Sequence, residues 1–177
     1  MTSPEANMAD SEVELLEFSS AAFRGLAEDP ARCARSVGFG LGGHTALIQV
    51  VAANSAAFQE REVIEPPWGG YLALDPSSRI VVVTCGFKGP PGADGAVEIA
   101  YFTFPGGEGK GFGTAMARAL CRIASALDEV RILRAHTLPE RNASTRTLGR
   151  IGFTHVADVI DPEDGPVWRW ERAPLAS

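Results

Sequence analysis

A glycine-dense segment over residues 106–114 is the part of the sequence best suited to hold a ligand. It reads GGEGKGFGT and contains five glycines. Glycine lets the backbone approach a ligand closely, and the free N–H groups at the start of a following helix attract phosphate. Two common nucleotide motifs are excluded. The Walker A motif requires Ser or Thr after the lysine, where this sequence has Gly111, and the GxGxxG motif requires a third glycine where it has Thr114. A turn without a ligand is the alternative, since glycine clusters often mark turns.

Charge is unevenly distributed along the chain, although the net charge is only -6. Residues 110–150 carry eight basic and three acidic side chains, a local charge of +5, so the rest of the chain has a charge of -11. This split predicts a basic face for one small polyanion and an acidic remainder that attracts cations. A solvated, arginine-rich helix face is the alternative. The negative total disfavours nucleic acid and anionic membranes as partners.

Glu98 is the candidate for proton transfer. It lies inside an otherwise apolar, strand-forming segment over residues 97–102. A carboxylate in such a strand is costly unless a cleft solvates it or a cation pairs with it. We therefore expect Glu98 to face a cleft; a solvent-facing residue or an ion pair with arginine is the alternative.

Cysteine and histidine positions predict neither a disulfide framework nor a metal site. The three cysteines are far apart, and the three histidines have no metal-ligand spacing. We expect reduced, buried thiols and no bound metal. A structural role is expected for His136, with contact to substrate as the alternative.

The elements that must position these residues follow an α+β order. A strand over 13–18, helical residues 19–37 broken at Pro30, a turn over 38–43 and a helix over 44–62 come first. Strands over 71–74, 79–87 and 96–104 then form an antiparallel meander. After the glycine segment come a helix, a strand over 130–137, a helix over 139–151 and closing strands over 153–160 and 167–171.

Apolar spacing predicts which faces of two helices are buried. The helix over 44–62 has one such set, made of Leu47, Val50, Val51, Ala57 and Phe58. The helix after the glycine segment has another, made of Phe112, Met116, Leu120, Ile123 and Leu127. We expect the second helix to pack on the sheet.

Length and hydropathy predict one soluble domain. The 177 residues suit a single core, with a loose tail over 1–10 and one domain over 11–177. The longest strongly apolar run, residues 80–87, is too short to cross a bilayer. The first 17 residues contain several acids and no Lys or Arg, so a cytoplasmic location is expected.

Two motifs resemble those of the GNAT superfamily of N-acetyltransferases. Its loop motif, Gln/Arg-x-x-Gly-x-Gly/Ala, is matched by residues 108–113 except that Glu108 replaces the first residue. Its second motif, an Asn-containing turn and a helix ending in Gly-Phe, is similar to residues 138–153. The similarity covers residues 68–170, and the branch most resembled is that of ribosomal-protein N-terminal acetyltransferases. It implies a mixed, mostly antiparallel sheet with flanking helices and a splayed parallel strand pair at the cofactor site.

The resemblance implies acetyl-CoA as co-substrate. The pantetheine arm is expected along Phe102, Thr103 and Phe104. The pyrophosphate is expected on the backbone of Gly109, Lys110, Gly111, Phe112, Gly113 and Thr114. Asn142 and Ser144 match positions that contact the cofactor, although capping of the following helix is an equal alternative.

The resemblance also implies direct attack of an amine on the thioester. A protonated amine cannot attack, so a base is needed, and Glu98 stands where some relatives have one. Many relatives use a helical Tyr as proton donor; here that Tyr is absent, and Tyr101, Ser144 or water is left to replace it. The acceptor is a peptide N-terminus or a small-molecule amine. A non-catalytic acyl-CoA-binding module is the alternative function, and some relatives form homodimers.

Overall fold

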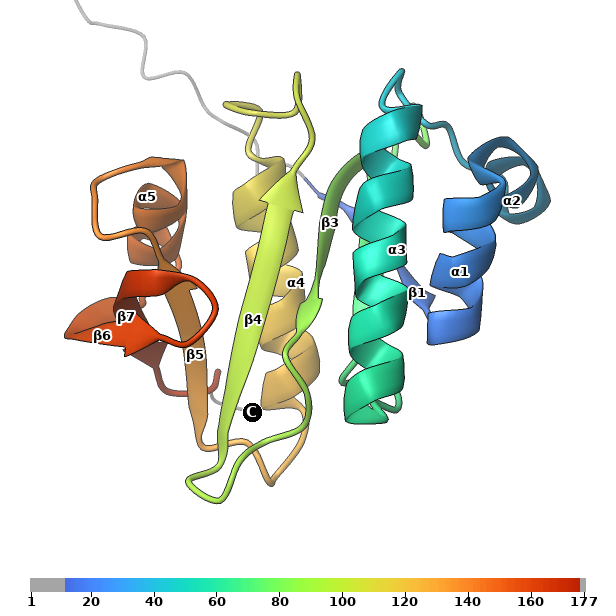
Figure 1. Ribbon diagram of the computed structural model, residues 1–177. Coiled ribbons are helices and arrows are strands. Elements are labelled where there is room, and N and C mark those ends of the chain that lie inside the picture. The colour runs from blue at the N-terminus through green and yellow to red at the C-terminus, as the bar shows by residue number, and fades with distance from the viewer. Residues whose placement is uncertain (1–11, 176–177) are drawn as a thin grey trace, which may run out of the picture.

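The computed structural model describes residues 12–175, so the tail predicted over 1–10 lies outside the described residues. Seven strands form one sheet in the order β1-β2-β3-β4-β5-β7-β6 (Figure 1). All neighbouring strands are antiparallel except β4 and β5, which are parallel. The α+β class and the parallel pair inside a mostly antiparallel sheet are thus confirmed.

Each predicted helix and strand forms close to its expected position. The strands are β1 (Glu14–Phe18), β2 (Gly70–Leu74), β3 (Val81–Phe87), β4 (Ala96–Thr103), β5 (Ile132–Thr137), β6 (Thr154–Asp161) and β7 (Gly165–Arg172). The helices are α1 (Ser20–Glu28), α2 (Pro30–Val37), α3 (Thr45–Glu62), α4 (Phe112–Ser125) and α5 (Ala143–Arg150). Helices α1 to α3 cover one face of the sheet, and α4 and α5 cover the other (Figure 1).

The two helices with predicted apolar faces behave differently. In α4 the prediction is confirmed, since Met116 and Leu120 are fully buried against the sheet. In α3 it is wrong, because the buried residues are Ile48, Ala52, Ala56 and Gln59. The small alanines let α1 pack closely on α3, and the Gln59 amide donates to the carbonyl of Phe18 at the end of β1 (3.2 Å). The face that carries Val51 and Phe58 is thereby left to line a pocket.

Strands β2 and β3 contain a pair of facing glycines. Gly70 and Gly86 are opposite each other in the ladder. A Cβ added to Gly86 would lie 2.5 Å from the carbonyl oxygen of Gly69, and backbone there cannot rotate away. Glycine at position 86 is therefore a packing requirement of the sheet beside the site.

We expect Gly86→Ala to lower the free energy of unfolding by about 1–3 kcal/mol, the usual cost of overpacking. Urea denaturation followed by circular dichroism measures this change. Gly25→Ala in α1 is the matched control, because no atom lies within 4 Å of its added Cβ. It is expected to leave stability unchanged or raise it. Equal stability of the two variants would show that the sheet accommodates the extra methyl group.

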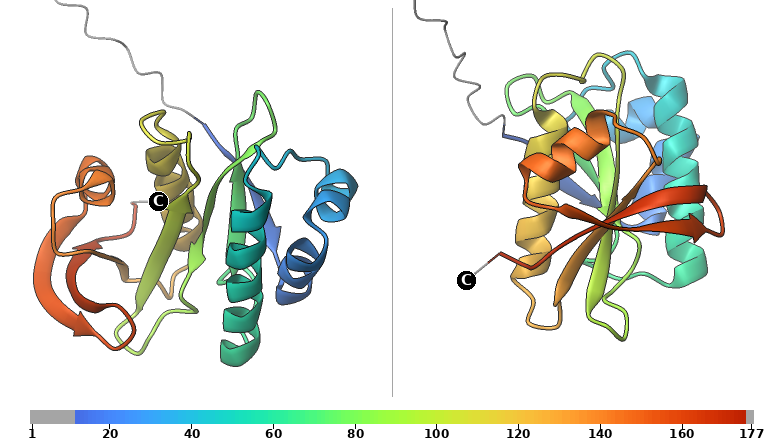
Figure 2. Two further views of the ribbon diagram at one scale, coloured as in Figure 1. Left: turned by 45° about the horizontal axis from the view of Figure 1, so that its top comes forward. Right: turned by 90° about the vertical axis from the view of Figure 1, so that its left-hand side faces the viewer.

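The parallel pair β4–β5 is the shortest ladder of the sheet. Only three residue pairs are in register, from Ala96 opposite Ile132 to Glu98 opposite Arg134. Beyond Glu98 the strands separate, and β5, α5 and the β6–β7 hairpin lie on the other side of β4 from β3 and α3 (Figure 2). The sheet therefore contains an internal gap with β4 along one side.

Candidate active site

The gap exposes backbone groups of β4 that would otherwise bond to β5. The Lys88 N–H donates to the Glu98 carbonyl and the Phe104 N–H donates to the Val82 carbonyl, both at 2.9 Å, so even-numbered residues of β4 bond to β3. Because hydrogen-bonding direction alternates along a strand, the N–H and C=O groups of Tyr101 and Thr103 face the gap. An extended ligand can bind to these groups. The Phe104 N–H, in contrast, is already used by β3.

One end of the gap is a cavity of about 390 Å³ formed by β4, the glycine loop and α5. The loop bends through Gly109 and Gly111, whose φ angles are 73° and 82° and which therefore suit glycine. Helix α4 begins directly afterwards, and no side chain caps its N-terminus. Its first N–H groups are thus available to an anion.

Most of the predicted cofactor residues meet in this cavity, and four do not. The cavity is lined by Phe102, Thr103, Gly109, Gly111, Gly113, Thr114 and Ser144. Asn142 lines the adjoining cavity at the middle of the gap. Phe104, Lys110 and Phe112 line a separate hollow beside His44, whose ring stacks on the buried Phe104 ring. The side chains of these last three residues are therefore placed away from the gap.

Two exposed arginines of α5 line the same cavity and were not singled out from the sequence. Arg146 and Arg150 are one helical turn apart and so lie on the same face of α5. Their spacing within the basic segment over 110–150 is the signal that could have identified them. Together with the N-terminus of α4, they make this end of the gap positive.

Glu108, the residue that departs from the family motif, stabilises the loop itself. Its carboxylate accepts a hydrogen bond from the Gly106 N–H at 2.7 Å. The negative charge is thus held by the loop backbone, which explains how a glutamate is tolerated beside a positive cavity.

Asn142 caps helix α5, as one of the two predicted roles requires. Its side-chain oxygen accepts from the Thr145 N–H at 3.0 Å, and its own N–H donates to the Thr145 hydroxyl at 3.0 Å. This reciprocal arrangement fixes the start of α5 and the position of Ser144. The Asn142 side chain also lines the middle of the gap.

The Tyr101 hydroxyl is buried beside the gap, and no hydrogen bond of good geometry to another described residue satisfies it. Burial raises the pKa of this tyrosine to about 12, and the nearby Ser144 hydroxyl acts in the opposite direction. Tyr101 and Ser144 line both the 390 Å³ cavity and an adjoining cavity of about 530 Å³. A buried, unpaired hydroxyl is costly, so this site suits a polar ligand atom.

Glu98 lies in the adjoining cavity next to the side chains of a lysine and a histidine. Its Oε1 is 3.0 Å from the Lys88 Nζ and 3.0 Å from the His136 Nδ1. The contact with His136 is an ion-pair distance without hydrogen-bond geometry, and the His136 Nε2 accepts from the Arg169 Nε at 3.3 Å. Because Nε2 accepts, the neutral ring carries its proton on Nδ1, toward Glu98. Glu98 thus faces a cleft and also forms an ion pair, with lysine rather than with arginine, while the His136 ring lies beside it.

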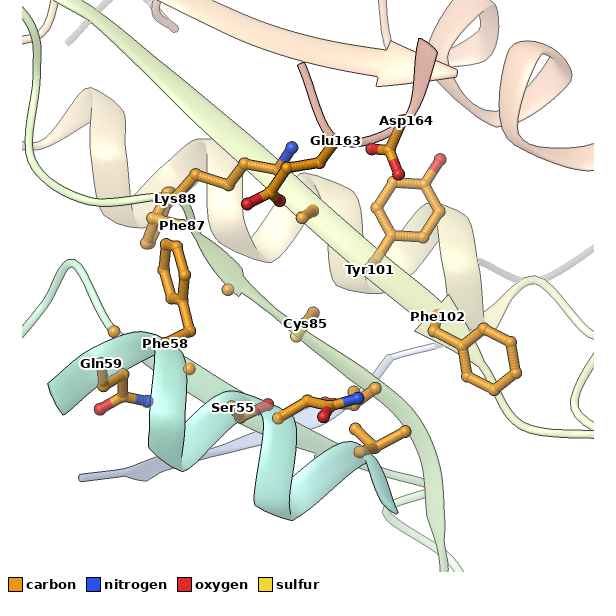
Figure 3. Close-up of a pocket in the computed structure, with 17 residues that line it drawn as sticks. Ser55, Phe58, Gln59, Cys85, Phe87, Lys88, Tyr101, Phe102, Glu163 and Asp164 are labelled. Atoms are coloured by element: carbon orange, nitrogen blue, oxygen red, sulfur yellow. The ribbon is translucent and has the colours of Figure 1, made fainter. Parts of the chain in front are cut away.

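A third, larger pocket of about 610 Å³ opens on the α3 side of β4 (Figure 3). Val51, Phe58 and Phe102 give it apolar walls, and Glu163 and Asp164 of the β6–β7 turn lie at its edge. It meets the cavity that contains Glu98 along β4, where both are lined by residues 100–102, and Lys88 and Asp164 line both as well. The segment Gly69–Gly70 lies in its wall, and Trp68 packs on Phe87.

The two buried cysteines, Cys85 and Cys121, supply no nucleophile here. Cys85 lines the pocket, but burial raises the pKa of its thiol far above the usual value, so the nucleophilic thiolate is suppressed. The pKa of Cys121 is raised to about 11 by burial. Over residues 12–175, no cluster of three metal-ligating side chains occurs, and no helix is long and apolar enough to span a membrane. The geometry therefore favours direct transfer over an enzyme-bound thioester.

Comparison with known proteins gives both a family and a fold. Residues 15–154 match the sequence profile described as "Acetyltransferase (GNAT) domain". No curated protein sequence matches the chain significantly.

Three solved structures illustrate the shared fold. A protein of Vibrio cholerae assigned as a ribosomal-protein-serine acetyltransferase has a TM-score of 0.66 at 12% identity, over 98% of this chain and 100% of that one. A Vibrio cholerae spermidine N-acetyltransferase chimera has a TM-score of 0.64 at 10% identity, over 93% and 96%. An aminoglycoside acetyltransferase in complex with coenzyme A has a TM-score of 0.63 at 18% identity, over 92% and 95%. The profile covers most of the chain, and the chain therefore belongs to the GNAT family of acetyl-CoA-dependent N-acetyltransferases.

Proposed function

We propose that the protein transfers the acetyl group of acetyl-CoA to a primary amine, a peptide N-terminus or a small-molecule amine, by direct attack in a ternary complex. The observation that carries this proposal is the gap between β4 and β5, which has a positive end at the glycine loop and Glu98 near its closed end. The larger pocket meets it along β4 and opens to solvent. Two substrates can therefore be held at the same time.

The residues of the gap suit the parts of acetyl-CoA. The backbone groups of Tyr101 and Thr103 match the amide-rich pantetheine arm, as a neighbouring strand would. The N–H groups after Gly111, together with Arg146 and Arg150, match the phosphates. Asn142 and Ser144 would line the arm where it passes α5.

Proton transfers can be assigned to residues at the closed end of the gap. Glu98 would take a proton from the acceptor ammonium, directly or through water. A backbone N–H of Tyr101 or Thr103 would stabilise the charge that develops on the thioester oxygen. The Tyr101 hydroxyl would give a proton to the departing thiolate, replacing the absent helical tyrosine. This proton donation need only have a modest effect on the rate, because the thiolate of a thiol with pKa near 8.5 is a good leaving group.

The 610 Å³ pocket favours a cationic amine attached to an apolar group. Its walls are mostly aliphatic and aromatic, and the acids at its edge attract positive charge (Figure 3). Among the proteins of similar structure are acetyltransferases of spermidine and of aminoglycosides, which are amines of this charge.

The test of the proposed function is acetyl-CoA-dependent thiol release with peptide N-termini, polyamines and aminoglycosides. We expect release with at least one of these classes, together with a product that carries one acetyl group. Binding of acetyl-CoA without turnover on any of them would instead support the non-catalytic binding module.

We expect Tyr101→Phe to lower kcat about 10- to 100-fold, because a proton donor contributes at most a few orders of magnitude and water can substitute in part. The Kd for acetyl-CoA should stay within about threefold. Because the raised pKa keeps Tyr101 protonated, its ionisation should not appear in the wild-type rate profile below about pH 11.

The chain offers a matched control in Tyr71, its other tyrosine. The Tyr71 hydroxyl donates to the Pro67 carbonyl at 2.7 Å, outside the gap. Tyr71→Phe should therefore cost about 1 kcal/mol of stability without slowing the reaction. A loss of activity in Ser144→Ala, with Tyr101→Phe unaffected, would assign the donor to Ser144 instead.

A cytoplasmic location, a single domain over 11–177 and a homodimer stay predictions from the sequence. The described residues share one continuous sheet, which supports the single domain.

A further inference from the structure

The cavity that contains Glu98 also contains a primary amine of the protein itself. The chain has two lysines, Lys88 and Lys110. Lys88 directly follows β3 and lines both the Glu98 cavity and the larger pocket. Lys110 lies in the glycine loop and lines the separate hollow beside Phe104. Of the two amines, only that of Lys88 thus lies where an acceptor amine is expected.

The position of Lys88 is fixed by backbone and side-chain contacts to the same residue. Its N–H donates to the Glu98 carbonyl at 2.9 Å, and its Nζ is 3.0 Å from the Glu98 Oε1. The two side chains are 37% and 20% exposed, so the pair is partly withdrawn from water but open to the pocket. The Lys88 ammonium therefore has the base within direct reach.

The charges that face Lys88 keep it protonated in the resting protein. Partial burial would lower the pKa of the Lys88 ammonium, but the hydrogen bond to Glu98 and the charges of Asp161 and Asp164 outweigh this effect and raise the pKa. Glu163 of the same β6–β7 turn also lines the pocket (Figure 3), and His136 faces the other side of Glu98. Lys88 thus resembles a bound cationic acceptor before deprotonation.

We propose that Lys88 is an internal acceptor, which takes the acetyl group of acetyl-CoA when no amine substrate occupies the pocket. The inference rests on the proposed function, because the same base and the same thioester are used. Glu98 takes one proton from the ammonium, and the neutral Nζ attacks the thioester carbon. The C–N bond forms, the C–S bond breaks, and the nitrogen loses its second proton as the thiolate gains one. The products are Nε-acetyl-Lys88, CoA and one released proton.

Acetylation would remove the positive charge that pairs with Glu98. The acetylated side chain is also bulkier and occupies part of the pocket. Acetylation of Lys88 therefore changes both the surroundings of the base Glu98 and the space for the acceptor amine, so the protein would regulate its own activity.

The test is peptide mapping by mass spectrometry after the full-length protein is incubated with acetyl-CoA and no added amine. Lys110 is the control within the same molecule, since any chemical acetylation by acetyl-CoA modifies it too. We expect one acetyl group per chain, on Lys88, formed about 100-fold faster than on Lys110, the size of effect that a positioned base supplies. The rate should be independent of protein concentration, as for an intramolecular reaction.

The pH dependence gives a second readout. Because Glu98 takes the proton from the Lys88 ammonium, the reacting form is the protonated lysine beside the carboxylate, and the acetylation rate of Lys88 should change little from pH 7 to pH 9. In Glu98→Gln the reacting form is the amine that has already lost its proton to solvent, and its fraction rises tenfold per pH unit below the pKa of the lysine. Glu98→Gln should slow the modification of Lys88 at least tenfold and leave that of Lys110 unchanged.

Failure of the inference is distinguishable from failure of the proposed function. Thiol release with added amines, while Lys88 is acetylated no faster than Lys110, would overturn the inference and leave the function standing. Acetyl-CoA binding without transfer to any amine or to Lys88 would overturn both. Equal modification of native and urea-unfolded protein would also overturn the inference, because no folded site would then be needed.

Discussion

Glu98→Gln is expected to lower kcat by about 10²- to 10⁴-fold, the range that a general base contributes. Glutamine preserves the size of the side chain and can still contact Lys88 and His136, but it cannot take a proton from the acceptor. The Kd for acetyl-CoA should remain within about twofold, because Glu98 lies beyond the phosphate end of the gap. Thiol release at saturating substrates measures kcat, and calorimetry measures Kd.

The residual activity of this variant should depend more steeply on pH. Without a base, the rate depends on the amine that is already neutral in solution, and that fraction rises tenfold per unit up to the pKa of the acceptor. Glu129→Gln is the control, since Glu129 is exposed and lines none of the cavities described. A parallel loss of acetyl-CoA affinity and kcat would mean that Glu98 is structural rather than the base.

Replacing both Arg146 and Arg150 by alanine is expected to weaken acetyl-CoA binding about 100-fold or more. A hydrogen bond to a charged group contributes about 1.5–3 kcal/mol, so two such contacts to phosphate allow at least this change. Both side chains are exposed, and the difference should shrink as salt screens the charges. The kcat at saturating acetyl-CoA should change little, because neither arginine reaches the reacting atoms.

Arg122→Ala separates local contacts from overall charge. Arg122 belongs to the same basic segment and is exposed on α4, but it does not line the gap. Its replacement should change the Kd less than threefold at physiological salt. A similar loss of affinity for Arg122→Ala would show that the field of the whole segment, rather than two placed side chains, binds the cofactor.

The features predicted correctly from sequence are those that local pattern determines. Strand runs, the glycine loop and the stripe through Met116 and Leu120 depend on residues close together in the chain. The α3 face was predicted wrongly because the helix has nearly equal apolar character all round. Its burial is decided by the alanines that meet α1 and by the contact of Gln59 with β1.

Individual residues of the candidate site were predicted from the sequence, but the contacts between them were not. Glu98 and the loop glycines were identified from type and position, whereas the neighbours Lys88, His136 and Arg169 come from the end of β3, from β5 and from β7. Strand register decides that Tyr101 and Thr103, rather than Phe104, present backbone to the gap. Strand register depends on contacts between strands that are far apart in the chain, so it could not be predicted from the local pattern of a single sequence.

The short ladder between β4 and β5 leaves a free strand edge in the middle of the sheet. Free edges normally invite pairing with other chains, and proteins protect them with cover or charge. Here residues of α5 and of the β6–β7 hairpin line the cavities beside this edge, so that the edge is covered by other parts of the same chain. The arrangement that forms a binding groove thus also protects against aggregation, because the unpaired backbone groups of β4 are not accessible for pairing with a strand of another molecule.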